Sequence, residues 1–167
     1  MKPEGVVAFI RHGTRAVHIA GITPNPDSSF MAQVARNLTD TADGFLIDKR
    51  YLILDRDTKF TDEFRRLLRG AGIEWLRTPY RSPNCNAVAE RFVKSIKDER
   101  LNRMIHFGDS SLRHALAEYE THYMRERTHQ GIGNQLVERR DPVHLAGHLR
   151  YSERLGGLLR SYHRVAA

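Results

Sequence analysis

Residues 51–57 have the sequence YLILDRD, and this stretch decides the fold. The run from Tyr51 to Leu54 is short and apolar, which is typical of a strand buried on both faces of a sheet. The strand should end at the polar residues Asp55 and Asp57. In sheets flanked by helices, functional side chains commonly lie where a strand ends. Asp55 is therefore the first candidate functional residue.

Strand and helix signals alternate on both sides of this stretch. Short apolar runs bounded by turn residues predict three more strands, of which a glycine-containing turn joins the first two as a hairpin: 6–10, 16–22 and 73–77. Apolar residues at helical spacing predict helices over 28–37, 62–70, 87–103 and 110–127. This order of elements predicts a mixed α/β sheet in one domain.

The charge balance favours a polyanionic partner. The 167 residues contain 27 Lys and Arg against 20 Asp and Glu, which gives a formal net charge of +7 and an isoelectric point near 9.9. Nucleic acid is the leading candidate for such a partner. A basic chain that binds no nucleic acid is the alternative.

Several other classes of protein are excluded. The single Cys85 excludes an internal disulfide and a thiolate zinc cluster. His144 and His148 have helical i, i+4 spacing, but no third ligand stands beside them, so packed or solvated side chains are the preferred interpretation. Neither an apolar stretch of about 20 residues nor a signal-peptide pattern is found. We expect a soluble, cytoplasmic protein without a membrane partner.

The predicted helix over 87–103 has two chemically different sides. Its apolar residues fall within an arc of about 140° that should face the sheet: Val88, Ala89, Phe92, Val93 and Ile96. Glu90, Lys94 and Lys97 lie within about 60° of one another on the opposite side. A carboxylate there can bind Mg²⁺, and the ammonium groups can hold phosphates. The alternative is a solvated face with an ordinary Glu90–Lys94 ion pair.

Two segments together resemble the integrase-core family of retroviral integrases and bacterial insertion-sequence transposases: 54–60, with the sequence LDRDTKF, and 79–92, with the sequence PYRSPNCNAVAERF. In that family a glutamate in an N-x-x-x-E-R-F helix lies about 35 residues after a strand-end aspartate, and Glu90 here is 35 positions after Asp55. Lys97 matches the family's basic residue seven positions after the glutamate. Residues 122–131 are similar to the family's closing segment. Taken together, the resemblance covers roughly residues 6–143.

The resemblance implies a ribonuclease H-like fold in which two aspartates and one glutamate hold two divalent ions, Mg²⁺ or Mn²⁺. The ions activate water or a DNA 3′-hydroxyl and stabilise the displacement at a phosphodiester. By this resemblance Asp55 and Glu90 are catalytic metal ligands. Four cationic residues are implied to contact DNA phosphates: Arg81, Arg91, Lys94 and Lys97. The implied function is DNA integration or transposition by a chain that forms a homo-oligomer at full length.

The sequence departs from the family at the first catalytic aspartate, which lies on a central strand ahead of the hairpin. Glu4 has no strand to hold it, while Asp27 is better explained as a helix cap and Asp57 lies in another element. We therefore expect an N-terminally truncated core over 1–143, with the first central strand missing and part of the core open to water. A short basic C-terminal tail over 144–167, with at most short helical pieces, should follow.

Two functions are compatible with this departure. The first is a divalent-metal-dependent integrase or transposase that transfers DNA strands. The alternative is a catalytically inactive transposase remnant that at most binds DNA or a partner. Because two carboxylates hold two ions poorly, we do not expect catalysis by this chain alone.

Overall fold

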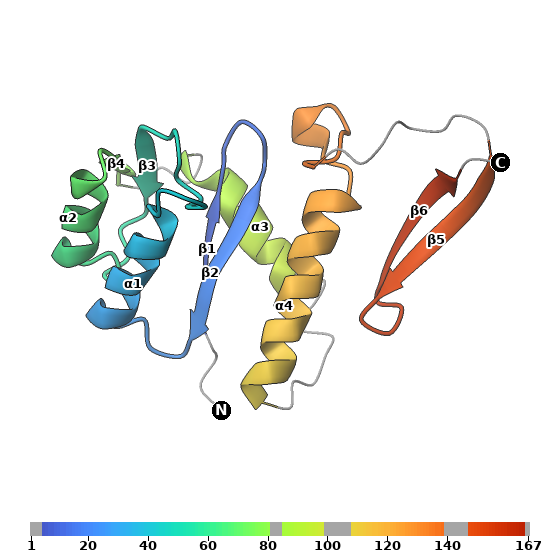
Figure 1. Ribbon diagram of the computed structural model, residues 1–167, viewed down its shortest axis with the longest axis horizontal. Helices are drawn as coiled ribbons and strands as arrows, with labels where there is room; N and C mark the ends of the chain where they lie inside the picture. Colours follow the sequence, from blue (N-terminus) through green and yellow to red (C-terminus); the bar gives the residue numbers. More distant parts are fainter. Residues whose placement is uncertain (1–4, 81–84, 99–107, 139–146, 166–167) are drawn as a thin grey trace. The chain divides into compact units, whose positions relative to one another are not determined.

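The structure, a computed structural model, describes residues 5–80, 85–98, 108–138 and 147–165 (Figure 1). The chain divides into two units. Unit 1 consists of Met1–Phe9 and His18–Arg91, and unit 2 consists of Ile10–Val17 and Phe92–Ala167. Asp55 and Glu90 therefore belong to unit 1, whereas Lys94 and Lys97 belong to unit 2.

The chain begins with the expected hairpin. Strands β1 (Gly5–Ile10) and β2 (Val17–Thr23) form a two-stranded sheet. The backbone N–H of Arg11 donates to the carbonyl of Ala16 at 2.7 Å and closes the turn between them. Val7 and Phe9 of β1 point into the core of unit 1, because alternate residues of a strand face the same side.

Helix α1 (Ser28–Leu38) begins at the predicted N-terminal cap, Asp27. Oδ1 of Asp27 accepts the backbone N–H of Phe30 at 2.8 Å, which satisfies one of the free donors at the start of the helix. The buried residues of α1 recur at helical spacing: Met31, Ala32, Val34, Ala35 and Leu38. This apolar side fixes the orientation of α1 against the rest of unit 1.

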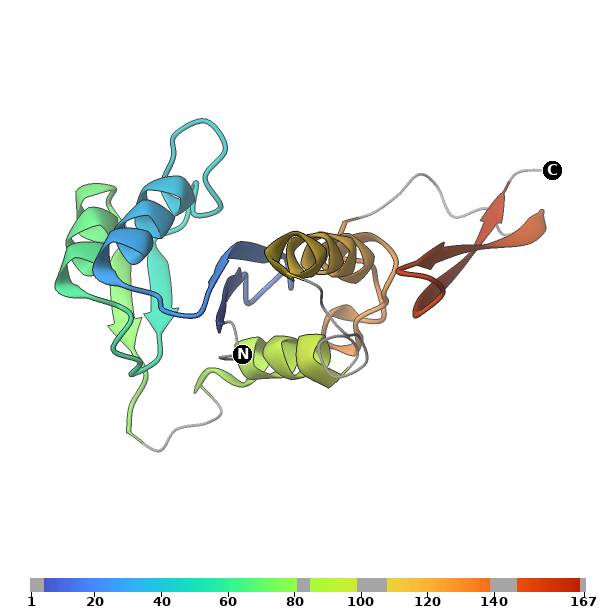
Figure 2. The same cartoon turned by 90° about the horizontal axis from the view of Figure 1, so that it is seen from below.

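The two predicted strands β3 (Tyr51–Leu54) and β4 (Glu74–Arg77) form a parallel pair, joined through helix α2 (Asp62–Gly70). Figures 1 and 2 both show α1 and α2 side by side next to these two strands. Phe64 and Leu68 of α2 are fully buried in one cluster with α1, β1 and β3. This cluster is the core of unit 1, and it holds the end of β3 in place.

The prediction that β3 is buried on both faces was wrong. Tyr51 and Ile53 are 47% and 46% exposed, and Leu76, which pairs with Ile53, is 48% exposed. Leu54 is buried and Leu52 packs partly against the core. Within the described residues β3 pairs only with β4, and the core cluster lies on one face of this pair. The strand is therefore half-buried, with side chains alternating between core and solvent.

Unit 2 is built around an aromatic cluster between helices α3 (Ala87–Ile96) and α4 (Gly108–Arg125). The Phe92 ring lies edge-on to Tyr123 at 4.8 Å and 6.2 Å from Tyr119, measured between ring centroids. The ring of His129, just before the short 3-10 helix η3 (Gln130–Ile132), lies tilted against Tyr123, with 4.3 Å between the ring centroids. Burial lowers the pKa of His129, so its neutral form is favoured, and Nε2 can donate to the carbonyl of Tyr123 at 2.8 Å.

The region expected to contain at most short helical pieces forms a β-hairpin. Strands β5 (His148–Arg154) and β6 (Leu159–Val165) pair antiparallel, with Tyr151 opposite Tyr162. Gly156 and Gly157 have φ angles of 66° and 88°, which glycine adopts without steric cost, and they turn the chain between the strands. Polar and charged residues dominate β5, so the alternation that identifies a strand was too weak to detect.

The mixed α/β class is confirmed. The paired strands among the described residues form three separate two-stranded sheets rather than one. A single ribonuclease H-like sheet, the absence of its first strand and the division at residue 143 stay predictions.

Candidate functional site

Asp55 lies on a turn that is held at both ends. It directly follows the buried Leu54, and its Oδ1 accepts the backbone N–H of Asp57 at 3.0 Å. Nε of Arg56 donates to the carbonyl of Thr78 at 3.2 Å, and the backbone N–H of Thr78 donates to the carbonyl of Leu54 at 3.0 Å. The ends of β3 and β4 are thus tied together beside Asp55. The half-buried carboxylate has a defined position from which to bind a cation.

Asp57 has a local structural role. Its Oδ2 pairs with Nζ of Lys59 at 2.6 Å, and its Oδ1 accepts the backbone N–H of Lys59 at 3.0 Å. Partial burial raises the pKa of Asp57, but the hydrogen bonds and the charge of Lys59 outweigh this effect and leave the pKa below its ordinary value. Asp57 is therefore ionised and bonded to Lys59. This is expected for a residue that stabilises the turn and is not a ligand of the candidate metal site.

Helix α3 carries the predicted charged row on its exposed side. Glu90, Arg91, Lys94 and Lys97 are all exposed, whereas Phe92 and Ile96 are each 2% exposed. No ion pair joins Glu90 to Lys94 in the part of the chain that the structure describes. The exposure of these residues agrees with a solvated face, but the ion pair expected on such a face is not formed among the described residues, so Glu90, Lys94 and Lys97 stay candidate ligand-binding groups.

The packing of α3 differs from the prediction in two respects. The buried arc is narrower than expected, because Val93 is 37% exposed. Phe92, which was expected to face the sheet, packs on Tyr119 and Tyr123 of α4. Helical periodicity identified the buried side, but it could not identify the element that covers that side.

The candidate ligands do not complete a metal centre by themselves. Within residues 5–80, 85–98, 108–138 and 147–165, no three or more His, Cys, Asp or Glu side chains are grouped so as to hold a metal ion. Arg81 and His144 lie outside the described residues. Asp55 and Glu90 supply the hard oxygen ligands that Mg²⁺ and Mn²⁺ prefer. The two residues fit such an ion by donor chemistry, although they are fewer than a two-ion centre requires.

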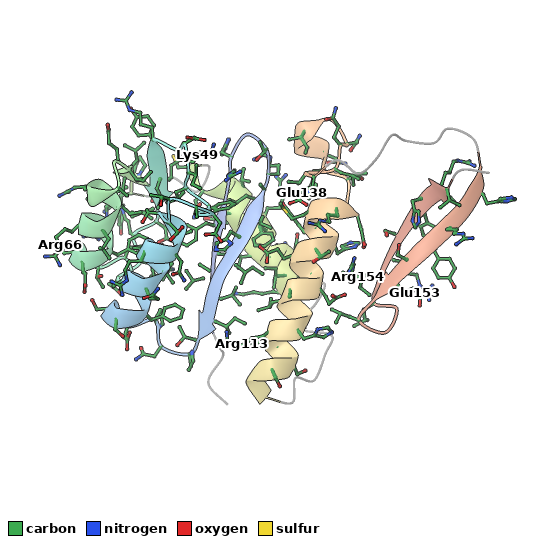
Figure 3. The ribbon with its side chains drawn as sticks, viewed as in Figure 1. Lys49, Arg66, Arg113, Glu138, Glu153 and Arg154 are labelled. Atoms are coloured by element: carbon green, nitrogen blue, oxygen red, sulfur yellow. The ribbon has the colours of Figure 1, made fainter. Side chains whose placement is uncertain are left out.

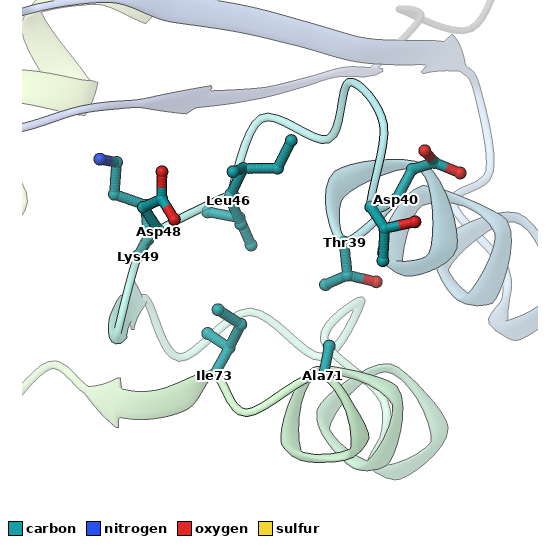
Figure 4. Close-up of a pocket in the computed structure, with 9 residues that line it drawn as sticks. Thr39, Asp40, Leu46, Asp48, Lys49, Ala71 and Ile73 are labelled. Carbon is teal, nitrogen blue, oxygen red and sulfur yellow. The ribbon is translucent and has the colours of Figure 1, made fainter.

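A separate cavity of about 370 Å³ opens in unit 1 (Figure 4). Figure 4 shows Asp48 and Lys49 on one side of it and Thr39 and Asp40 on the other. None of the predicted site residues lines it. Oδ1 of Asp40 accepts the backbone N–H of Ala42 at 2.8 Å, so this carboxylate already has a structural partner. The cavity is therefore distinct from the candidate site at β3 and α3.

A buried charged cluster in unit 2 was not predicted. Arg154 of β5 donates from Nη2 to Glu126 at 2.8 Å and from Nη1 to Glu118 at 3.0 Å, and Nδ1 of His122 lies 3.0 Å from Glu126 (Figure 3). Burial raises the pKa of Glu126, but the bonds from Arg154 and His122 outweigh it, so the pKa lies below its ordinary value. Glu118, His122 and Glu126 are four residues apart in the sequence. This helical spacing is the signal from which the cluster could have been predicted.

Comparison with known proteins finds one family whose model matches part of the chain. Residues 71–136 match the integrase core domain. The match contains β4, α3 and α4, and with them Glu90, Arg91, Lys94 and Lys97, whereas Asp55 lies outside it. No curated protein matches the chain. None of the described helices is both long enough and apolar enough to cross a membrane.

Proposed function

We propose that this chain, whose residues 71–136 belong to the integrase core domain family, acts in divalent-metal-dependent DNA strand transfer. The match to this domain supports a role in DNA integration or transposition, with DNA as the partner. In this proposal Asp55 and Glu90 bind the metal. Four cationic side chains bind DNA phosphates: Arg81, Arg91, Lys94 and Lys97. The exposed charged row on α3 is the observation that carries the proposal.

The electrostatics of α3 suit a phosphate ligand beside a metal. Lys94 and Lys97 project from the exposed side that also carries Glu90, and no ion pair between Glu90 and Lys94 neutralises them. Lysine binds a phosphate as a compact positive charge, and each contact releases counterions from the DNA. A divalent ion at Asp55 and Glu90 would supply activation of water or of a 3′-hydroxyl. The residues of α3 would then orient the phosphodiester next to that ion.

DNA binding without catalysis is the second candidate function. The observation that favours it is that, among the described residues, no three His, Cys, Asp or Glu side chains are grouped so as to hold a metal ion. Two divalent ions about 4 Å apart repel each other strongly, and carboxylates must offset that repulsion. Strand transfer therefore needs a further acidic ligand, whereas phosphate binding by Lys94 and Lys97 does not.

Metal binding should depend on both candidate ligands. Asp55→Asn and Glu90→Gln keep the shape of each side chain but remove its charge, so each is expected to weaken Mn²⁺ binding by about tenfold or more. Titration of Mn²⁺ followed by electron paramagnetic resonance measures this affinity without requiring activity. Asp43→Asn, at an exposed carboxylate away from the site, is the matched control. Equal affinities in all four proteins would remove the assignment.

DNA binding should be sensitive to salt through Lys94 and Lys97. The Lys94→Ala/Lys97→Ala variant is expected to reduce the magnitude of the slope of log affinity against log salt by about 0.9 per lysine on duplex DNA. Fluorescence anisotropy at several salt concentrations measures the slope. The control, Lys49→Ala/Arg66→Ala, removes two exposed cations that belong to unit 1 and lie outside α3 (Figure 3). If both variants change the slope equally, only net charge is involved and the site assignment is wrong.

A further inference from the structure

The β5–β6 hairpin has one face that is exposed along its whole length. Pairing of the strands places three cross-strand pairs on this face: Leu149 with Arg164, Tyr151 with Tyr162, and Glu153 with Arg160. All six side chains are exposed. Side chains of paired residues lie on the same side of a sheet, so these six form one continuous surface, named here the tyrosine face.

The opposite face of the hairpin is anchored. Leu159 and Ser161 are buried, and Arg154, which pairs with Leu159, bonds to Glu118 of α4 and to Glu126 just after it. Figure 3 shows Arg154 on the side of β5 toward α4. Because alternate residues of a strand point to opposite sides, this anchor turns the tyrosine face away from α4.

The two tyrosines offer their rings to solvent. Tyr151 and Tyr162 are 63% and 65% exposed, and their ring centroids lie 6.2 Å apart at an interplanar angle of 45°. Leu149 beside them is also 63% exposed. Contiguous exposed apolar and aromatic side chains of this kind mark interaction sites. At this distance and angle neither tyrosine ring covers the other, so a flat ligand can contact both rings.

Positive charge surrounds the tyrosine pair. Arg160 and Arg164 lie two residues either side of Tyr162 on the same face. Arg164 donates from Nη1 to the carbonyl of Gly147 at 3.0 Å, a contact that leaves its charge uncompensated. Arg160 pairs with Glu153 at 2.8 Å, yet its side chain is 58% exposed. The tyrosine face thus carries two arginines and one acid, and this net positive charge complements a polyanion.

We propose that the tyrosine face binds single-stranded DNA, with unpaired bases stacked on Tyr151 and Tyr162 and phosphates held by Arg160 and Arg164. Aromatic rings alternating with cations are the combination that single strands recognise, because every base has a flat face and every linkage a charge. In a duplex the base faces are already stacked and cannot reach the rings. The choice of DNA over RNA rests on the proposed function, whereas the stacking itself does not.

The test compares three double variants of the full chain by anisotropy, with a labelled single strand of about ten nucleotides. Tyr151→Thr/Tyr162→Thr keeps strand propensity but removes the rings, and it is expected to weaken binding by about tenfold or more. Tyr151→Phe/Tyr162→Phe keeps the rings and should bind within about twofold of the original chain. Arg160→Gln/Arg164→Gln should reduce the salt slope by about 0.7 per arginine, the value for single strands.

The duplex of the same sequence separates this surface from α3. The threonine variant should bind the duplex as the original chain does, whereas Lys94→Ala/Lys97→Ala should weaken duplex binding. Unchanged single-strand affinity in the threonine variant, or equal loss in the threonine and phenylalanine variants, overturns the proposal. Tighter binding of the corresponding RNA overturns the choice of DNA. None of these outcomes changes the duplex result for Lys94→Ala/Lys97→Ala, by which the proposed function is judged.

Discussion

Replacing Phe92 by alanine is expected to lower the free energy of unfolding by about 3–5 kcal/mol. The Phe92 side chain is 2% exposed and contacts both Tyr119 and Tyr123, so its removal leaves a cavity at the centre of the aromatic cluster. A rigid cluster of rings closes such a cavity poorly, which adds to the lost burial. Urea denaturation followed by circular dichroism measures the loss.

Val93→Ala is the matched control for this prediction. Val93 is the neighbour of Phe92 on α3, but it is 37% exposed and should cost less than about 1 kcal/mol. A similar loss in the two variants would show that helix propensity, and not the aromatic cluster, dominates at these positions. Because Phe92 lies between Glu90 and Lys94, its loss should also weaken DNA binding by loosening the helix that carries them.

Replacing Arg154 by leucine should destabilise the fold by a similar amount, about 3–5 kcal/mol, because it removes the cation that pairs with Glu118 and with the buried Glu126. The Glu126 side chain is 2% exposed, and Arg154 supplies two of its hydrogen bonds, at 2.8 and 3.0 Å. Arg160→Leu is the control, since it breaks the exposed pair with Glu153 and should cost no more than about 1 kcal/mol. Equal costs would mean that the buried cluster contributes no more than a surface pair.

The effect of Arg154→Leu should also depend on pH. In the original chain the pKa of Glu126 lies below its ordinary value of 4.5, so its contribution is present above pH 4.5 and lost as pH falls through the lower folded value. In the variant, burial is opposed by His122 without Arg154, so the pKa of Glu126 is expected to rise. The buried charge then destabilises the fold at neutral pH, and acidification relieves this effect. The gap in unfolding free energy between the two proteins should therefore narrow from pH 7 towards pH 4.5, which a series of urea denaturations would detect.

Local sequence signals predicted unit 1 well. The caps at Asp27 and Thr61 and the helical spacing of apolar residues fixed the positions of α1 and α2, because these interactions span only a few residues. The exposure of β3 was not predictable in this way. Whether both faces of a strand are covered depends on elements distant in the sequence, and a run of four apolar residues is compatible with either outcome.

The candidate site, too, was predicted where it depends on local signals and missed where it depends on contacts distant in the sequence. The periodicity of α3 correctly predicted that Glu90 and Lys94 are exposed, but it placed the exposed Val93 on the buried side. It did not predict that Phe92 packs on α4, because that contact joins residues far apart in the sequence. The β5–β6 hairpin was missed for a different reason: its strands are held by Arg154 and by cross-strand pairing, and neither produces a regular apolar pattern.

The bonds of Arg154 restrict which amino acids evolution can accept at this position. Three separate nitrogen atoms of its guanidinium reach two different carboxylates, Glu118 and Glu126. A lysine carries the same charge on a single nitrogen and cannot reproduce this planar fork. We therefore expect relatives that keep both glutamates and the hairpin to keep arginine here, even where they exchange lysine and arginine freely at exposed positions. An alignment of such relatives with lysine at this position would contradict that expectation.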